Sequence, residues 1–309
     1  MWEPQSTNLV PYSEDFSHNS WIDIDVSIES GYLAPDGTNS AYKVTSTGTQ
    51  AHLYTGGNFT GIKHKSIYAR TLSGTGTVNL CNRNSDTNAL FTITEQWQRF
   101  NISHSDVDLF YAVDFRGAGA TLSEVIIWGA QLEEQSYATS YIPTSGSTVT
   151  RNQDVCTNGG SLATINSTEG VLYAEIAALV DTDIADRVIS LSDNTITNRV
   201  ELKLAATGSI QGRFDSATSD ITLTKIGIST TNTNKIALYW ESGKCALWIN
   251  GIKEQENLTF NTFASNALID LSFNSAFSGG SSNFFGKTKA LAVWKEALSD
   301  SELQSLTTI

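Results

Sequence analysis

Hydrophobic and polar residues alternate with a period of two along most of the chain. In WIDIDVSIES, four aliphatic residues from Ile22 to Ile28 alternate with Asp, Ser and Glu. Such alternation is typical of β-strands that turn one face to a core and the other to water, so we expect the isoleucine face to be buried. In LFYAVDFRG, the same period places Tyr111 and Val113 on one face.

Further strand-like segments follow one another throughout the chain, separated by Gly, Asn and Ser. They are SIYART, TVNLCN, LFTIT, WQRFNIS, GVLYAEIAAL, RVISLS, RVELKLA, SIQGRFDS, DITLTKIG, KIALYW, LIDLSFN and KALAVW. Tight turns are predicted at the SG pair 242–243 and at the NG pair 250–251, which needs positive φ. Ser299 and Glu302 form a capping box and predict a short C-terminal helix. Many short strands with turn signals between them indicate an all-β sandwich or barrel.

The stretch SYATSYIPTSGSTVTR interrupts this pattern near the middle of the chain. Its composition is polar, and strand-like alternation resumes only after it. A length of 309 residues is close to the size at which one hydrophobic core stops growing. We therefore predict two tandem β-sandwiches, residues 1–150 and 151–309, with this stretch as the connector.

Charge and cysteine usage exclude several classes of function. The formal net charge is −13 and no Lys/Arg cluster occurs, so neither nucleic acid nor an anionic membrane surface is an expected partner. No segment is long and apolar enough to predict membrane insertion, and MWEPQSTNLV lacks the features of a signal peptide. The three cysteines lack metal-binding or disulfide-framework spacing, and we expect them to be small strand residues of a protein made in a reducing compartment.

Catalytic patterns are also missing from the sequence. A glycosidase on such a fold needs two carboxylates on one strand face, and Asp23-x-Asp25 reads instead as the solvated face of a strand. No nucleophile elbow or Ser-His-Asp grouping is visible. We therefore expect no enzymatic activity.

Sugar binding needs an aromatic side chain that stacks on a pyranose ring, with polar groups beside it that reach hydroxyls. Several positions combine these chemistries, although each is also compatible with an ordinary surface or core role. The candidates are His52, Tyr54, Asn82, Arg83, Arg213, Asp215 and Trp248. The segment VDTDIAD, with Asp181 and Asp183, is a candidate calcium loop or an acidic turn.

Four segments of the first half resemble landmarks of one known module, in the same order. WEPQSTNLVPYSEDFSHNSW, APDGTNSAYKV, WQRFNIS and VIIWGAQLEEQSYATSYIPTSGSTVTR resemble a module common in phage tail and structural proteins, over residues 3–152. The resemblance implies a jelly-roll carbohydrate-binding domain. It also implies a structural calcium ion near the first strand, for which Asp15 is the candidate ligand. Because that module usually follows other segments, the chain is either a short protein or a C-terminal piece.

The second half is similar to the laminin G-like, concanavalin A-like sandwich, through GVLYAEI, LYWESGKCALWINGIK and KALAVWKEALSDSELQSL. Together the resemblances favour a non-catalytic phage virion protein of tail-fibre, receptor-binding type that attaches to bacterial surface polysaccharide. We expect it to be made in the host cytoplasm, to reside in the virion with other virion proteins, and to form a homo-oligomer such as a trimer. The alternatives are a structural head-decoration or tail-assembly protein without glycan binding, and a polysaccharide-degrading enzyme.

Overall fold

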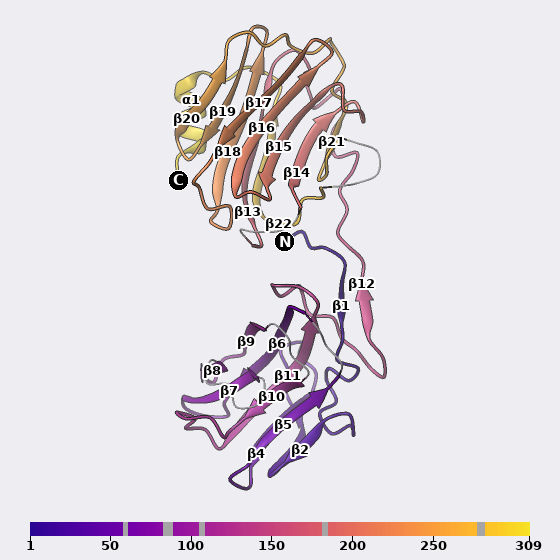
Figure 1. Ribbon diagram of the computed structural model, residues 1–309, viewed down its shortest axis with the longest axis vertical. Helices are drawn as coiled ribbons and strands as arrows, with labels where there is room; N and C mark the ends of the chain where they lie inside the picture. Colours follow the sequence, from indigo (N-terminus) through magenta and orange to yellow (C-terminus); the bar gives the residue numbers. More distant parts are fainter. Residues whose placement is uncertain (58–60, 83–88, 105–108, 181–184, 277–281) are drawn as a thin grey trace. The chain divides into compact units, whose positions relative to one another are not determined.

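The protein is an all-β chain that divides into two compact units (Figure 1). The computed structural model describes residues 1–57, 61–82, 89–104, 109–180, 185–276 and 282–309. One unit is Gln5–Gln153, and the other combines Asp154–Ile309 with Met1–Pro4. The chain therefore passes between the units twice, whereas the sequence prediction had one division, between residues 150 and 151. In the described ranges no helix is long and apolar enough to cross a membrane.

The unit 5–153 is a sandwich of two five-stranded antiparallel sheets. The first sheet has the order β2 (Ile22–Ile24), β5 (His52–Gly56), β10 (Leu109–Asp114), β7 (Gly76–Asn82), β8 (Leu90–Ile93). The second has the order β3 (Val26–Tyr32), β4 (Ala41–Ser46), β11 (Glu124–Glu133), β6 (Lys63–Arg70), β9 (Gln98–His104). A core that includes Leu53, Ile67, Leu80, Val113 and Ile127 fills the space between them.

The segment predicted as one strand from residue 22 to 28 is two strands in different sheets. Asp25 adopts a positive φ of 49°, which ends β2 and redirects the chain into β3. Val26 and Ile28 pack against the core, whereas Ile22 and Ile24 are 41% and 38% exposed. The prediction that the whole isoleucine face is buried is therefore wrong for β2, because the kink takes these two side chains out of the alternation.

The first part of the stretch predicted as a connector is packed into the unit 5–153, with Thr139, Ile142 and Thr144 buried, and its exposed end is a paired strand. β12 (Val149–Arg151) pairs with β1 (Ser6–Asn8), and the buried Asn8 donates from Nδ2 to the carbonyl oxygens of Ala130 and Ile142 at 3.0 and 2.8 Å. Glu133, fully buried, accepts hydrogen bonds from Ser6, Gln135 and Thr139. Buried polar side chains thus satisfy the backbone of a segment whose composition alone suggests a loop.

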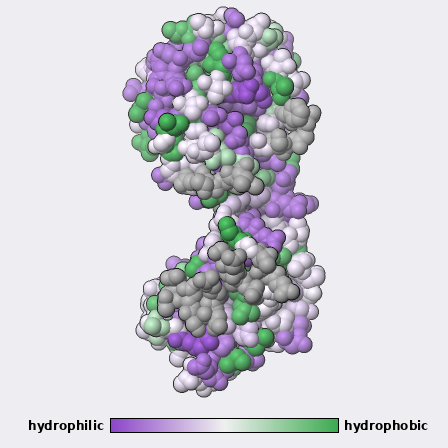
Figure 2. Space-filling model, viewed as in Figure 1, coloured by the Kyte–Doolittle hydropathy of each residue, from purple (hydrophilic) through white to green (hydrophobic). Residues whose placement is uncertain are grey.

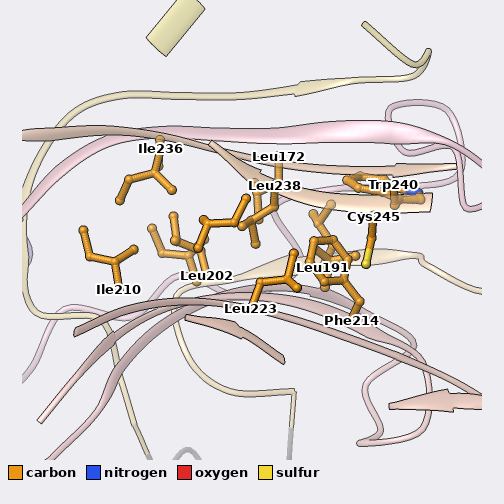
Figure 3. Close-up of a cluster of buried hydrophobic side chains, with 14 of the residues drawn as sticks. Leu172, Leu191, Leu202, Ile210, Phe214, Leu223, Ile236, Leu238, Trp240 and Cys245 are labelled. Carbon is orange, nitrogen blue, oxygen red and sulfur yellow. The ribbon is translucent and has the colours of Figure 1, made fainter. Parts of the chain in front are cut away.

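The unit that contains residues 154–309 is a second sandwich of two five-stranded sheets. One sheet has the order β20 (Ile252–Asn257), β19 (Lys244–Ile249), β18 (Asn234–Glu241), β13 (Gly170–Ala178), β22 (Gly286–Trp294). The other has the order β17 (Ser219–Lys225), β16 (Ser209–Ser216), β15 (Arg199–Ala205), β14 (Arg187–Ser192), β21 (Asp270–Ser272). Figure 3 shows Leu172, Leu238 and Trp240 of the first sheet facing Leu191, Leu202 and Phe214 of the second.

The turns and the helix predicted in this unit are confirmed. Asn250 and Gly251 have φ angles of 51° and 83° between β19 and β20. Helix α1 (Asp300–Thr307) begins at the capping box of Ser299 and Glu302 and lies against β18, β19 and β20 (Figure 1). It covers an outward apolar cluster of that sheet.

The N-terminal residues also pack within this unit. Trp2 exchanges two backbone hydrogen bonds with Gly286, at 2.8 and 2.9 Å, and its ring stacks on Phe273 with centroids 4.4 Å apart. Glu3 and Asp154 are likewise joined by the bond from Glu3 N to the Asp154 carboxylate at 2.8 Å. A strand-like N-terminal segment is therefore part of the second sandwich.

The cysteines are free thiols, and their positions follow their small apolar character. Cys81 and Cys245 are fully buried, and burial raises the pKa of each thiol to about 12. Both thiols are therefore protonated and unreactive at neutral pH. On the face shown in Figure 2, hydrophilic and hydrophobic residues are interspersed over the described parts of each unit.

Candidate functional site

Two rows of side chains cross the outward face of the first sheet of the unit 5–153. Leu53, Leu80 and Val113 point into the core, so the residues next to them, His52, Tyr54, Asn79 and Asp114, point outward, and the stack of Tyr111 on Tyr54 places Tyr111 on the same face. One row of register partners is Ile22, Tyr54, Tyr111 and Asn82, and the other is Ile24, His52, Asp114 and Asn79. Of the residues predicted from the sequence, the structure therefore brings together His52, Tyr54 and Asn82.

Three aromatic rings form the centre of this face. The rings of Tyr54 and Tyr111 stack with centroids 5.0 Å apart and an interplanar angle of 18°. The His52 ring lies 5.5 Å from Tyr54 and 5.3 Å from Tyr111. The Arg116 guanidinium lies 5.4 Å from the centroid of the Tyr111 ring. His52 and Tyr111 are 7% and 4% exposed, so of the three rings Tyr54, which is half-buried, is the one that solvent reaches.

A polar margin is formed by an ion pair on β10 and the residues that follow it. Arg116 donates from Nε and Nη2 to the two carboxylate oxygens of Asp114, at 2.9 and 2.8 Å. Burial acts to raise the pKa of the Asp114 carboxyl, but the hydrogen bonds and charge of Arg116 outweigh it, and the pKa is lowered. The pair therefore keeps the guanidinium in place beside the aromatic rings.

His52 contributes an uncharged ring to the same face. Its Nδ1 lies 2.6 Å from the Gln50 carbonyl oxygen, which only accepts, so Nδ1 carries the proton. Burial lowers the pKa of His52, and the nearby Arg116 lowers it further. The imidazole is therefore neutral at pH 7.

Asn79 lies buried at the β7 side of the face. It is 1% exposed, its Nδ2 donates to the Asp114 carbonyl oxygen at 3.4 Å, and its Oδ1 is buried without a hydrogen-bond partner among the described residues. Gly117 passes so close that a Cβ there would lie 1.9 Å from Asn79 Nδ2. Arg83, another candidate predicted from the sequence, lies outside the described residues.

The remaining residues of this face were missed by sequence reasoning because β10 contains a bulge. The register of β10 shifts between Tyr111 and Val113, so Tyr111 points outward while Val113 points into the core. The prediction that both lie on one face is therefore wrong. A strict period of two gives no signal for the extra residue, Ala112. Asp114 and Arg116 in turn come into place only through this bulge.

Arg213 and Asp215 are brought together elsewhere, on the outward face of the second sheet of the unit that contains residues 154–309. Asp215 Oδ2 accepts from Arg213 Nε at 2.8 Å and from Arg199 Nε at 2.6 Å, and Arg199 Nη1 also donates to Glu201 at 3.1 Å. Burial raises the pKa of the Asp215 carboxyl, against the effect of Arg199 and Arg213. Sequence reasoning missed Arg199 and Glu201, although their spacing of two mirrors that of Arg213 and Asp215 on the paired strand.

Trp248 is not exposed for stacking on a sugar. Its side chain is 5% exposed and belongs to the cluster under α1 that includes Tyr239 and Leu303. The Lys253 ammonium lies 5.5 Å from its ring centroid. Trp248 does lie on the other face of the sheet from Leu247, as the alternation predicts. Helix α1 covers that outer face, so the prediction of an accessible indole is wrong.

The predicted calcium ligands are not assembled into a site by the described residues. The Asp15 carboxylate oxygen Oδ1 accepts hydrogen bonds from Ser17 N and Oγ and from the Tyr42 hydroxyl, and its pKa is lowered chiefly by Ser17. Among the described residues no group of three or more His, Cys, Asp or Glu could hold a metal ion. Asp181 and Asp183 lie outside the described residues, and calcium binding stays a prediction.

Comparison with known proteins gives likenesses of fold over about half of the chain. No family model matches the chain, and no curated protein matches it. The Ruminococcus gnavus IT-sialidase CBM40 is 16% identical, with 46% of this chain and 84% of that chain covered, at a TM-score of 0.40. The native heptameric SAP-like pentraxin from Limulus polyphemus is 13% identical, with 48% of this chain and 72% of that chain covered, at a TM-score of 0.38.

A third likeness is to domain 4 of AbnA, a GH43 extracellular arabinanase from Geobacillus stearothermophilus, solved in complex with arabinotriose. It is 13% identical, with 56% of this chain and 81% of that chain covered, at a TM-score of 0.37. At this level of similarity, a function for the chain has to be argued from its own side chains.

Proposed function

We propose that the chain is a non-catalytic glycan-binding protein of a phage virion, of tail-fibre or receptor-binding type, which recognises glycans of the bacterial surface. The observation that carries the proposal is the half-buried Tyr54 ring, which is held by its stack on the buried Tyr111 ring, with the Asp114–Arg116 ion pair beside that stack. The assignment to a phage virion depends on the sequence resemblance of residues 3–152 alone.

The chemistry of this face suits a carbohydrate. The apolar C–H face of a pyranose ring stacks on a tyrosine ring, and the sugar hydroxyls need donors and acceptors at its rim. The Arg116 guanidinium, whose side chain is 17% exposed and which Asp114 holds beside Tyr111, supplies the donor at this rim. A single such site binds weakly, so we further propose that a homo-oligomer, such as a trimer, provides avidity on the virion.

The test is a glycan array with the whole chain and two variants, Tyr54→Ala and the matched control Tyr32→Ala. Tyr32 is a half-buried tyrosine on the other sheet of the same unit. We expect Tyr54→Ala to weaken binding by about tenfold, because a stacked aromatic ring and its apolar contact contribute about 1–2 kcal/mol. Tyr32→Ala is expected to bind as the unchanged chain does.

The same array, run with calcium and with a chelator, separates the remaining possibilities. A loss of binding with the chelator would support the predicted calcium ion. A blank array with folded protein would favour the structural virion component. Release of reducing sugar from any bound glycan would contradict the non-catalytic proposal.

A further inference from the structure

The aromatic face extends into an exposed apolar strip at the edge strand β2. Ile22 and Ile24 are 41% and 38% exposed, and their register partners on β5 are Tyr54 and His52. Cross-strand partners project to the same side of a sheet, so both isoleucines lie on the surface that carries the stacked tyrosines. An exposed apolar pair that continues an aromatic surface has the composition of a ligand contact.

The strip is held in place from both of its ends. Before β2, Trp21 is 4% exposed and its Nε1 donates to the Tyr12 carbonyl oxygen at 2.9 Å. The Thr55 hydroxyl donates to the Ser20 carbonyl oxygen at 3.0 Å and joins this entry to β5. After β2, Gln50 N donates to the Asp25 carboxylate at 3.0 Å, at the kink. The isoleucines are therefore fixed outward rather than left on a frayed strand end.

The face has an apolar side and a polar side. Adjacent strands are about 4.8 Å apart, so β2, β5 and β10 together span roughly 10 Å. Ile22 and Ile24 occupy the β2 side, the half-buried Tyr54 occupies the middle, and Arg116, held by the buried Asp114, occupies the β10 side. A sugar ring stacked on Tyr54 with its hydroxyls toward Arg116 turns its opposite substituent toward β2.

We propose that the sugar unit bound at this face carries a methyl group, as an N-acetyl or a 6-deoxy substituent, and that the methyl group rests on Ile22 and Ile24. This inference depends on the proposed function, and it names the class of sugar. Polar hydroxymethyl or hydroxyl groups in that position would lose water contacts against two isoleucines without gaining a hydrogen bond. A buried methyl group gains affinity by roughly threefold to tenfold.

The experiment is an NMR titration of the whole chain with matched sugar pairs. The pairs are N-acetylglucosamine and glucose, N-acetylgalactosamine and galactose, and L-fucose and L-galactose. We expect the methyl-bearing member of at least one pair to bind threefold to tenfold more tightly. The double variant Ile22→Thr, Ile24→Thr, which keeps β-branched residues in the strand, is expected to remove this preference while both sugars still bind.

Two further variants separate the failure of this inference from the failure of the proposed function. Ile252→Thr, at an isoleucine of β20 that is 59% exposed, is the matched control and is expected to keep the preference. Equal affinity within every pair, or a preference that survives the double variant, overturns the methyl contact while glycan binding stands. Tyr54→Ala without effect on any bound sugar overturns the proposed site itself, and the inference with it.

Discussion

The two units each present an outward sheet face with polar and charged side chains, and the two faces differ in how those groups are satisfied. On the face of β14–β17, two arginines and three carboxylates bond to one another, and most of them are buried. On the face of β2, β5, β10 and β7, one ion pair borders stacked aromatic rings and exposed isoleucines. Both faces contain residues that the sequence marked as sugar-binding candidates.

The comparison shows that residue type does not identify a binding site without the hydrogen-bond partners. The Arg213 and Asp215 side chains have the right chemistry for hydroxyl groups, but each already bonds to another charged group of the same sheet. Breaking such a network to admit a ligand would leave buried charges uncompensated. On the aromatic face, a sugar can contact the half-buried Tyr54 and the exposed Ile22 and Ile24 without displacing an ion pair.

The largest expected effect in this comparison is on stability, at Arg199. Arg199→Ala leaves the Glu201 and Asp215 carboxylates, 3% and 5% exposed, without their shared guanidinium. We expect a loss of about 3–5 kcal/mol in the free energy of unfolding of this sandwich, because removing one partner strands buried charges. Urea denaturation followed by the fluorescence of the buried Trp240 measures it.

Arg213→Ala is the matched control for that experiment. The Arg213 side chain is 30% exposed, and Arg199 still bonds to Asp215 without it. We expect a loss of about 1 kcal/mol or less. Equal losses for the two variants would contradict the distinction between the buried and the exposed arginine.

Local signals in the sequence were sufficient wherever the structure is local. The NG turn at 250–251 and the Ser299 capping box have the geometry that their residue types require, since both are decided within four residues. Alternation also predicted an all-β sandwich fold correctly. It could not predict which sheet each strand joins, because β2 and β3 share one alternating pattern and are separated only by the kink at Asp25.

The candidate site, too, could be predicted only where it depends on residues close together in the sequence. His52 and Tyr54 were visible as an aromatic pair on one strand, but Tyr111 reaches them only through the bulge on β10. The buried Asn8 and Glu133 side chains, which hold the apparent connector, bond to residues more than 120 positions away in four cases. No local pattern reports contacts at that separation.

A smaller effect is expected at Asp114, on the aromatic face. Asp114→Asn removes the charge of a carboxylate that is 1% exposed and loosens Arg116 from beside Tyr111. We expect a loss of about 1–3 kcal/mol in the free energy of unfolding of the unit 5–153 at pH 7, together with weaker glycan binding. Denaturation and the glycan array measure the two effects.

The sign of the pH dependence at Asp114 follows from its lowered pKa. Its contribution to stability is present above the unfolded value of 3.8 and is lost as the pH falls through the folded value. Glu29→Gln, at an exposed glutamate paired with Lys43, is the control and is expected to change stability little. Unchanged glycan binding by Asp114→Asn would exclude the ion pair from the site.

Trp248 provides a third test, in which stability and binding separate. Trp248→Phe removes part of a side chain packed under α1, and we expect the sandwich around it to lose about 1–1.5 kcal/mol. Glycan affinity is expected to stay unchanged, because the indole is covered. Weaker glycan binding by a variant that remains folded would restore Trp248 as a candidate and place a site on the second sandwich.

The smallest expected effect is a pH dependence that differs between the units. All four histidines lie in the unit 5–153, and burial lowers the pKa of both His52 and His64 below 6.5. The unfolded chain therefore binds more protons just below that value, and the unit loses stability as the pH falls from 7.5 to 5.5. At His52, the charge of Arg116 lowers the pKa further, whereas the charges of Asp114 and Asp25 act to raise it. At His64, the charge of Arg99 lowers the pKa further, whereas the charge of Glu133 acts to raise it.

Hydrogen exchange read out by mass spectrometry follows both units within the whole chain, because slow amides of core strands report the unfolding of each unit. We expect peptides from β10 and β11 to lose protection at pH 5.5, after correction for intrinsic exchange, and peptides from β13 and β18 to keep it. The variant His52→Gln, His64→Gln is expected to flatten the dependence of β10 and β11. Equal losses of protection in both units would contradict this prediction. They would assign the loss of stability at pH 5.5 to carboxylates, which both units contain, rather than to the histidines.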